Sequence, residues 1–480
     1  MDEKYSHKES LAGEKLSNED SPRFLLPSVD VRRVPWWKLD VQILPIVTIM
    51  YLLNFLDRGN IGNARVAGLQ ANLGMTDSQY SLLLTATLIP YALVEIPSNL
   101  FLTRIGAHIV LPTLVVIWGA VTAFQGLVTS YGGLVACRVI LGCCEGGLLP
   151  GLSLYVASFY PRSKLQLRIA LFFASTALAG AFSGLLASAI DHLDGHDGRP
   201  AWKYIFILEG SFTVLYGLVC FVIMPRSLST IPLLTSEEWS NAEALLVQEH
   251  TMLAKDDGHF SWSSTLNALF QPHVLLYFVL GFFGGMYVGG IENFEPSIVE
   301  SLGYTANRAQ LMSVPPYAVA WAVNIITAFV SDRYRLRGVT VMFHSMLATI
   351  GFAVFLGSKN NHVRYGSLFL FVPGVYCSPP SLLAWAANNS APRFRRAAVI
   401  AFLLSSTSLG GILATWLFGS LSKAPDYDNA TIVSIVFSAG MIVAAFANIV
   451  WLNAQNKKRK AVANPGPVND DRSDGFLYKL

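Results

Sequence analysis

Long apolar blocks alternate with short polar segments along most of this 480-residue chain. Each block is long enough to cross the hydrocarbon core of a bilayer as a helix, which takes about 20 residues. The pattern predicts six spans on each side of one longer polar stretch, at 41–64, 79–102, 108–128, 131–157, 166–190, 202–224, 273–297, 308–330, 339–357, 363–388, 397–421 and 431–453. Two groups of six spans indicate two pseudo-repeated helical bundles.

The polar segments divide the chain into five regions. We expect an N-terminal tail, a first six-helix bundle, a central loop, a second six-helix bundle and a C-terminal tail, with the boundaries 1–39, 40–224, 225–271, 272–453 and 454–480. The first tail is rich in Ser, Glu, Lys and Asp, which predicts disorder. The expected fold class is therefore an all-α membrane protein with twelve transmembrane helices in two pseudo-symmetric six-helix bundles.

Composition supports a membrane protein, since 53% of the residues are hydrophobic and only 14% are charged. The sequence has no HExxH motif, no phosphate-binding glycine loop and no arguable Ser-His-Asp arrangement, so we expect neither an enzyme nor a cofactor. The five cysteines lie inside apolar blocks at spacings that match no metal site, which predicts free thiols. The one basic run, Lys457–Lys460, suits contact with anionic lipid and not with nucleic acid.

Cations are distributed unequally between the two sets of loops. One set carries most of them, namely Arg104, Arg162, Lys164, Arg168, Arg333, Arg335, Arg337, Arg393, Arg395 and Arg396. The positive-inside rule places that set in the cytoplasm, together with both termini and the central loop. We expect a monomer in the plasma membrane.

Two charges inside the apolar block 131–157 stand out. Arg138 and Glu145 are seven residues apart, which puts them on one helix face about 10.5 Å apart along the axis. Each costs roughly 2.5–3.5 kcal/mol at mid-membrane, so neither is expected to face lipid. A cation and a proton-accepting carboxylate on one cavity wall suit a carrier that couples an anion to protons, with substrate and Glu145 competing for Arg138. The alternative is a structural helix whose charges pair with neighbouring helices.

Asp57 and Arg58 lie near the end of the first span, at a depth similar to that of Arg138. Two guanidinium groups at one level can clamp a carboxylate through bidentate hydrogen bonds. Arg58 and Arg138 are therefore candidate substrate-binding residues. The alternative is that Asp57 and Arg58 form an ion pair at the lipid headgroups.

The second half of the chain offers polar candidates for the same cavity. Asn388, Asn389 and Ser405 can supply amide and hydroxyl groups from spans 10 and 11. The alternative is interhelical packing, a common role of small polar residues in membranes. Glu292 and Glu295 lie near the outer end of span 7, where we expect exposure to water.

Four stretches resemble the major facilitator superfamily and, within it, the anion:cation symporter family, with the fungal allantoate, nicotinate and pantothenate permeases as the nearest branch. The resemblance covers about 40–455 and is carried by Tyr51-Leu-Leu-Asn-Phe-Leu-Asp-Arg-Gly-Asn-Ile-Gly-Asn-Ala64, Glu95-Ile-Pro-Ser-Asn-Leu100, Arg138-Val-Ile-Leu-Gly-Cys-Cys-Glu145-Gly-Gly-Leu-Leu-Pro-Gly151, and Phe294-Glu-Pro-Ser-Ile-Val-Glu-Ser-Leu-Gly-Tyr304 with Pro315-Pro-Tyr317.

This resemblance implies roles for the charged residues of spans 1 and 4. Asp57 and Glu145 would serve proton coupling, and Arg58 and Arg138 would bind an anion. The implied function is proton-coupled symport of a small organic anion by alternating access. Two alternatives stay open: an exporter of an acidic secondary metabolite, and a non-transporting membrane sensor on the same scaffold.

The resemblance also implies gating residues on the cytoplasmic side. The loop after span 2 reads Thr103-Arg104, where the superfamily normally has an Asp-Arg pair, and the equivalent loop after span 8 keeps Asp332-Arg333. Glu95 lies between two prolines of span 2, so it is either a gating residue or a structural one. Glu292 and Glu295 depart from the family, which commonly has neutral residues there.

Overall fold

The computed structural model describes residues 34–256, 267–334, 336–391, 393–461 and 476–479, and these contain helices and no strands. The helices of the first half are α1 (Trp36–Val66), α2 (Leu69–Asn72), α3 (Asp77–Ile105), α4 (Ala107–Gln125), α5 (Tyr131–Glu145), α6 (Leu148–Ala157), α7 (Arg162–Phe173), α8 (Ser175–Asp191) and α9 (Ala201–Ile223). Those of the second half are α12 (Pro272–Ser301), α13 (Ala306–Tyr334), α14 (Arg337–Gly357), α15 (Asn361–Asn388), α16 (Arg393–Trp416), the π-helical turn η4 (Leu417–Leu421) and α17 (Asp428–Lys460). Between the halves lies α10 (Ser236–Asp256), a helix within the predicted central loop.

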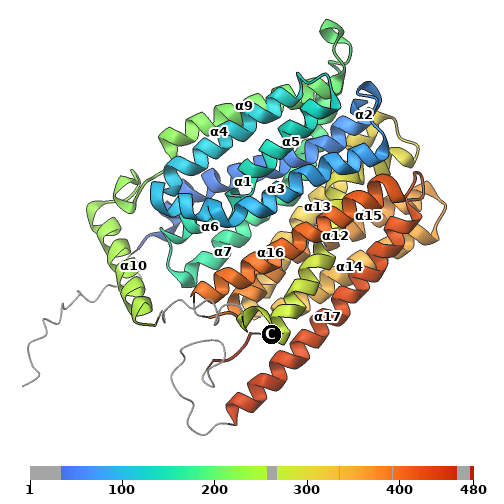
Figure 1. Cartoon of the computed structure of the whole chain (residues 1–480). Coiled ribbons are helices and arrows are strands. Elements are labelled where there is room, and N and C mark those ends of the chain that lie inside the picture. The colour runs from blue at the N-terminus through green and yellow to red at the C-terminus, as the bar shows by residue number, and fades with distance from the viewer. Residues whose placement is uncertain (1–33, 257–266, 335, 392, 462–475, 480) are drawn as a thin grey trace, which may run out of the picture.

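Eleven helical segments of the described residues are long and apolar enough to cross a membrane, with α5–α6, most of α7–α8 and most of α16–η4 each counted as one. Helix α3, 29 residues long, has the length to cross as well. With α3, the described part of the chain contains the twelve long helical segments that its hydropathy predicts. Figure 1 shows them running side by side.

Glycines allow the helices of each bundle to approach closely. A Cβ atom on Gly146 would collide with the backbone carbonyl of Tyr91, and one on Gly410 with that of Phe282. Such contacts between small residues and facing backbone are a common way to pack helices in lipid, where apolar burial gives no driving force.

Among the described residues, the two bundles meet mainly where α1 packs against α12, α8 against α13, and α3 against α16. Polar contacts join them near the end of the molecule away from the chain termini. The hydroxyl oxygens of Thr85 and Thr415 are 3.2 Å apart, and Asn307 donates to the carbonyl of Ser188 at 2.8 Å. The bundles are therefore held together at that end.

The opposite end gathers the start of α1, helix α10 and the last described residues (Figure 1). Lys38 on α1 forms an ion pair with Glu238 on α10 at 2.8 Å. The segment Phe476–Lys479 docks on the second bundle. There Asn389 donates to the carbonyl of Lys479 at 2.8 Å and accepts from its backbone N–H at 2.6 Å.

We predict that Gly62→Ala lowers the thermal unfolding midpoint relative to Gly59→Ala. An added Cβ at Gly62 would lie 2.7 Å from the carbonyl oxygen of Asn293 on α12, whereas one at Gly59 lies 3.9 Å from that of Glu292. Overpacking of this kind costs about 1–3 kcal/mol, and both changes gain the same helix propensity. Thermal scans of the two purified variants measure the difference. Equal midpoints would contradict the packing of α1 against α12.

A second matched pair tests the docking of the C-terminal segment. Asn389→Ala removes three hydrogen bonds, two to Lys479 and one at 2.9 Å to the hydroxyl of Tyr277. The expected loss of stability is about 1–3 kcal/mol, with faster protease cleavage of a C-terminal tag. The Asn388 side chain makes no hydrogen bond within the described residues, so Asn388→Ala serves as the control. A tag cleaved at the same rate in both variants would count against docking.

Candidate functional site

The centre of the site is an ion pair within the first bundle. Arg58 on α1 donates from Nε and Nη2 to the same carboxylate oxygen of Glu145 on α5, with both distances 3.2 Å. The Glu145 side chain is fully buried and that of Arg58 is 13% exposed. Each of these buried charges is stabilised by the other, because an unpaired buried charge would strongly destabilise the protein.

Arg58 also lies beside an acid of the second bundle. Its Nε atom is 3.9 Å from a carboxylate oxygen of Glu292 on α12. Its guanidinium carbon lies 4.6 Å from the ring centre of Tyr91 and 5.3 Å from that of Phe55, which adds cation–π attraction. One guanidinium therefore connects acids from both bundles.

Arg138 is not the hydrogen-bonded partner of Glu145, contrary to our expectation, because Arg58 takes that place. Arg138 is 1% exposed, and its Nε and Nη2 atoms have no hydrogen-bond partner. Its guanidinium carbon lies 5.6 Å from the ring centre of Phe206 on α9. Both arginines lie in the first bundle, but Arg58 lies beside Glu292 of the second bundle, whereas Arg138 lies beside Phe206.

Asp57 does not pair with Arg58, because adjacent helical residues point about 100° apart. Its side chain is fully buried and accepts hydrogen bonds from the indole of Trp118 on α4 at 3.0 Å and the hydroxyl of Thr213 on α9 at 2.9 Å. An ion pair of Asp57 and Arg58 at the headgroups is therefore excluded.

Glu209 on α9 is a buried acid that our reading of the sequence missed. It accepts a hydrogen bond from Asn60 at 2.6 Å, and Asn60 in turn accepts one from Ser183 at 3.1 Å. Asn63 donates to the same Ser183 hydroxyl at 2.6 Å. The available signal was an acid in the middle of the apolar block 202–224, the same signal that identified Glu145.

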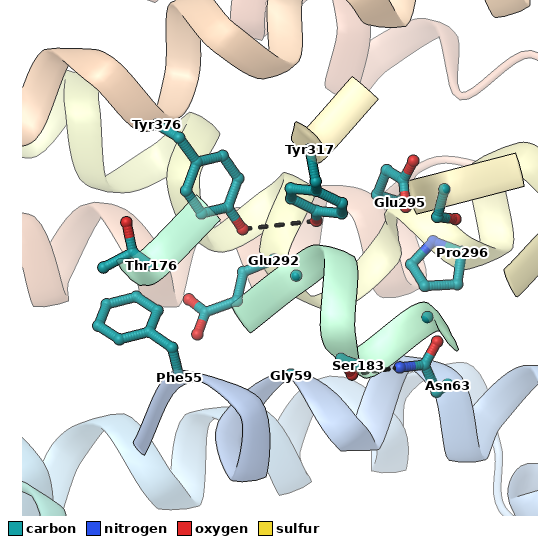
Figure 2. A pocket seen from close by; sticks show the side chains of 13 residues that line it. Phe55, Gly59, Asn63, Thr176, Ser183, Glu292, Glu295, Pro296, Tyr317 and Tyr376 are labelled. Atoms are coloured by element: carbon teal, nitrogen blue, oxygen red, sulfur yellow. Dashed lines mark hydrogen bonds between the residues drawn. The ribbon is translucent and has the colours of Figure 1, made fainter. Parts of the chain in front are cut away.

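A small cavity of about 20 Å³ lies between the two bundles. Its walls come from α1, α8, α12, α13 and α15, and two acids, Glu292 and Glu295, project from α12 (Figure 2). Tyr317 and Tyr376 face each other across the top of the view, with hydroxyl oxygens 3.5 Å apart. No arginine or lysine is among the described residues that line it.

Our expectation that Glu292 and Glu295 are exposed to water is wrong. The Glu292 side chain is 9% exposed, and Glu295 is fully buried. The reason is the packing of α12 against α1, where Gly62 leaves room for the α12 backbone. The two bundles therefore cover both acids.

The polar candidates of the second half do not gather at this cavity. Asn388 is twelve residues after Tyr376 on α15, about 18 Å along the helix axis. The neighbouring amide of Asn389 is occupied by Lys479. Ser405 is half-buried on α16 and is not among the residues that line the cavity.

The expected gating residues lie apart from the cavity. Arg104 and Arg333 are exposed near the ends of α3 and α13, while Glu95 is buried within α3. The side chain of Asp332 lies outside the described residues. The described part of the chain contains no group of three His, Cys, Asp or Glu residues placed to hold a metal ion, and its five cysteines are free thiols.

Comparison with known proteins agrees with this architecture. The sequence model of the Major Facilitator Superfamily matches residues 47–415. The MFS-type transporter efuF of Hormonema carpetanum is 32% identical over 428 residues, which are 88% of this chain and 86% of that protein. The MFS-type transporter cnsO of Penicillium expansum is 32% identical over 439 residues, 88% of this chain and 84% of that protein.

Two solved structures share the fold. The crystal structure of a D-xylose-proton symporter has a TM-score of 0.64 at 15% identity, covering 85% of this chain and 97% of that chain. An inward-facing bacterial homologue of the human lysosomal transporter Spinster has a TM-score of 0.63 at 17% identity, covering 86% and 94%. The twelve-helix architecture, the family match over most of the sequence and the fungal relatives together show that this chain belongs to the Major Facilitator Superfamily of membrane transporters.

Proposed function

We propose that this transporter is a proton-coupled symporter of a small organic anion, of the anion:cation symporter type, that works by alternating access. The observation that carries the proposal is the position of Arg58, which binds Glu145 in its own bundle and lies 3.9 Å from Glu292 of the other bundle. The proposal includes a monomer in the plasma membrane with both termini in the cytoplasm, as the distribution of cations indicates.

Binding begins with competition for one guanidinium. The donors of Arg58 that now hold Glu145 form a planar fork, which suits a substrate carboxylate equally well. An anion that enters between the bundles reaches Arg58 beside Glu292 and takes over these donors. Arg138, whose Nε and Nη2 atoms lack partners, is the second cation of the proposed site.

Proton uptake follows from the loss of the ion pair. When the anion holds Arg58, the carboxylate of Glu145 is left buried without its partner, and an unpaired buried charge is strongly disfavoured. Glu145 therefore takes a proton. When the anion leaves, Arg58 returns to Glu145 and the proton is released. Anion and proton bind together because the same guanidinium serves both carboxylates in turn, and buried Asp57 is the companion acid.

The exchange of partners at Arg58 also affects the interface between the bundles. Arg58 and Glu292 lie on α1 and α12, which pack against each other. A substrate that draws Arg58 away from Glu292 weakens an attraction between the bundles. Rocking of one bundle against the other then exposes the site to the opposite side of the membrane.

We predict that Arg58→Lys and Arg58→Ala both weaken anion binding roughly tenfold to a hundredfold, which corresponds to the loss of one hydrogen bond to a charged group, about 1.5–3 kcal/mol. Lysine fails because its point charge does not reproduce the planar fork. Uptake of labelled monocarboxylates by cells that express each variant, with and without a proton gradient, measures the change. The control is Arg65→Lys on the same helix. Arg65 does not line the cavity, and it forms an ion pair with Asp77 at 3.0 Å. Wild-type affinity in Arg58→Lys at equal surface expression would refute the role.

We predict that Glu145→Gln keeps substrate exchange across the membrane but loses accumulation driven by the proton gradient. Glutamine imitates the permanently protonated acid, so Arg58 is free to hold the anion while no proton is carried. Counterflow and gradient-driven uptake in proteoliposomes of the same variant separate the two steps. Glu243→Gln, which changes an exposed acid of α10, is the control. If gradient-driven accumulation persists in Glu145→Gln, Glu145 does not carry the proton, and Asp57 and Glu292 become the next candidates.

A further inference from the structure

Glu295 is a buried carboxylate that forms no ion pair within the described residues, and the polar side chain beside it is Ser313. Its side chain is fully buried, and neither carboxylate oxygen has a hydrogen-bond partner. None of the ion pairs found among the described residues includes it. The nearby hydroxyl of Ser313 donates to the carbonyl of Ala309 at 3.0 Å instead. The charged form of a buried acid in this state is strongly disfavoured, and it is relieved either by uptake of a proton or by a donor from a bound molecule.

Glu295 faces the same cavity as Glu292. The two acids are three residues apart on α12, which places them on one helix face with a rise of about 4.5 Å between them. Figure 2 shows both beside the cavity, with Tyr317 and Tyr376 along the same side. Glu292 has Arg58 as its neighbour, whereas Glu295 has no cation. Arg58 is not among the residues that line the cavity, but it lies beside Glu292, and Glu295 lies about one helical turn further along α12.

We propose that Glu295 accepts a hydrogen bond from an amine or hydroxyl group of the substrate. The site then selects small carboxylates that carry a hydrogen-bond donor at the end of the molecule away from the carboxylate. This assignment rests on the proposed function, in which Arg58 holds the substrate carboxylate. An ammonium group fits best, because it also offsets the repulsion between two acids one turn apart.

A series of three acids of equal length tests the assignment. 4-Aminobutanoate, 4-hydroxybutanoate and pentanoate differ only in the group at the far end, which is an ammonium, a hydroxyl or a methyl. Ligand-dependent thermal stabilisation of the purified full chain gives the Kd of each. We expect 4-aminobutanoate to bind roughly tenfold to a hundredfold more tightly than pentanoate, with 4-hydroxybutanoate between them.

The variant Glu295→Gln is expected to abolish this preference, so that the three acids bind with similar affinity. Glu300→Gln, which changes an exposed acid further along α12, is expected to keep it. The affinities of the three acids are also measured with the unaltered protein, so the proposal can be tested even if Glu295→Gln fails to fold. Equal affinities for the three acids in the unaltered protein, or failure of all three to bind, overturn the proposal.

Two further results distinguish this proposal from a proton-carrying role of Glu295 and from failure of the proposed function. If Glu295→Gln keeps the preference for donors but loses gradient-driven accumulation, Glu295 carries a proton and the donor assignment is wrong. If the affinity for pentanoate is unchanged in Arg58→Lys, the carboxylate does not bind Arg58 and the proposed function fails. A pentanoate affinity that depends on Arg58, together with no gain for the donor-bearing acids, overturns the role of Glu295 alone.

Discussion

A single guanidinium among buried acids is the constraint on which the arrangement of this site depends. Arg58 lies within an apolar helical bundle, where an unpaired charge is strongly disfavoured. The protein satisfies it with Glu145 at 3.2 Å and Glu292 at 3.9 Å. One cation shared by two carboxylates leaves at least one of them incompletely neutralised. In the proposed mechanism, this incomplete neutralisation is what lets a substrate anion take Arg58 and a proton take Glu145.

The close approach of the two bundles encloses the cavity and keeps water away from the buried acids. Gly62 on α1 lies against the backbone of α12, and Gly180 on α8 lies against the ring of Tyr317 on α13. Larger side chains at these points would separate the bundles and admit water around the acids. Water would weaken each ion pair several-fold, because attraction between charges scales inversely with the dielectric constant. The small residues therefore support the electrostatics of the site as well as the packing.

Behind the cavity, hydrogen bonds hold the acids that do not face it. Asp57 is held by Trp118 and Thr213, and Glu209 by Asn60. These contacts join α1 to α4 and α9 inside the first bundle. The acids of this bundle thus have protein partners, whereas Glu295 of the second bundle has none within the described residues. This difference is the reason why we propose a ligand contact for Glu295.

Much of the fold follows from the sequence alone, because the tendency to cross a bilayer depends on local apolar content over about 20 residues. Charges inside such segments are costly wherever they point, so the sequence alone indicates Arg58, Arg138 and Glu145 as a candidate site. It does not indicate their pairing, because that joins residues far apart in the chain. Arg58 and Glu145 are 87 positions apart. Whether a side chain faces a cavity, water or another helix depends on how the two bundles meet. That packing buries Glu292 and Glu295, and the docking of the last residues on Asn389 removes that amide from the cavity.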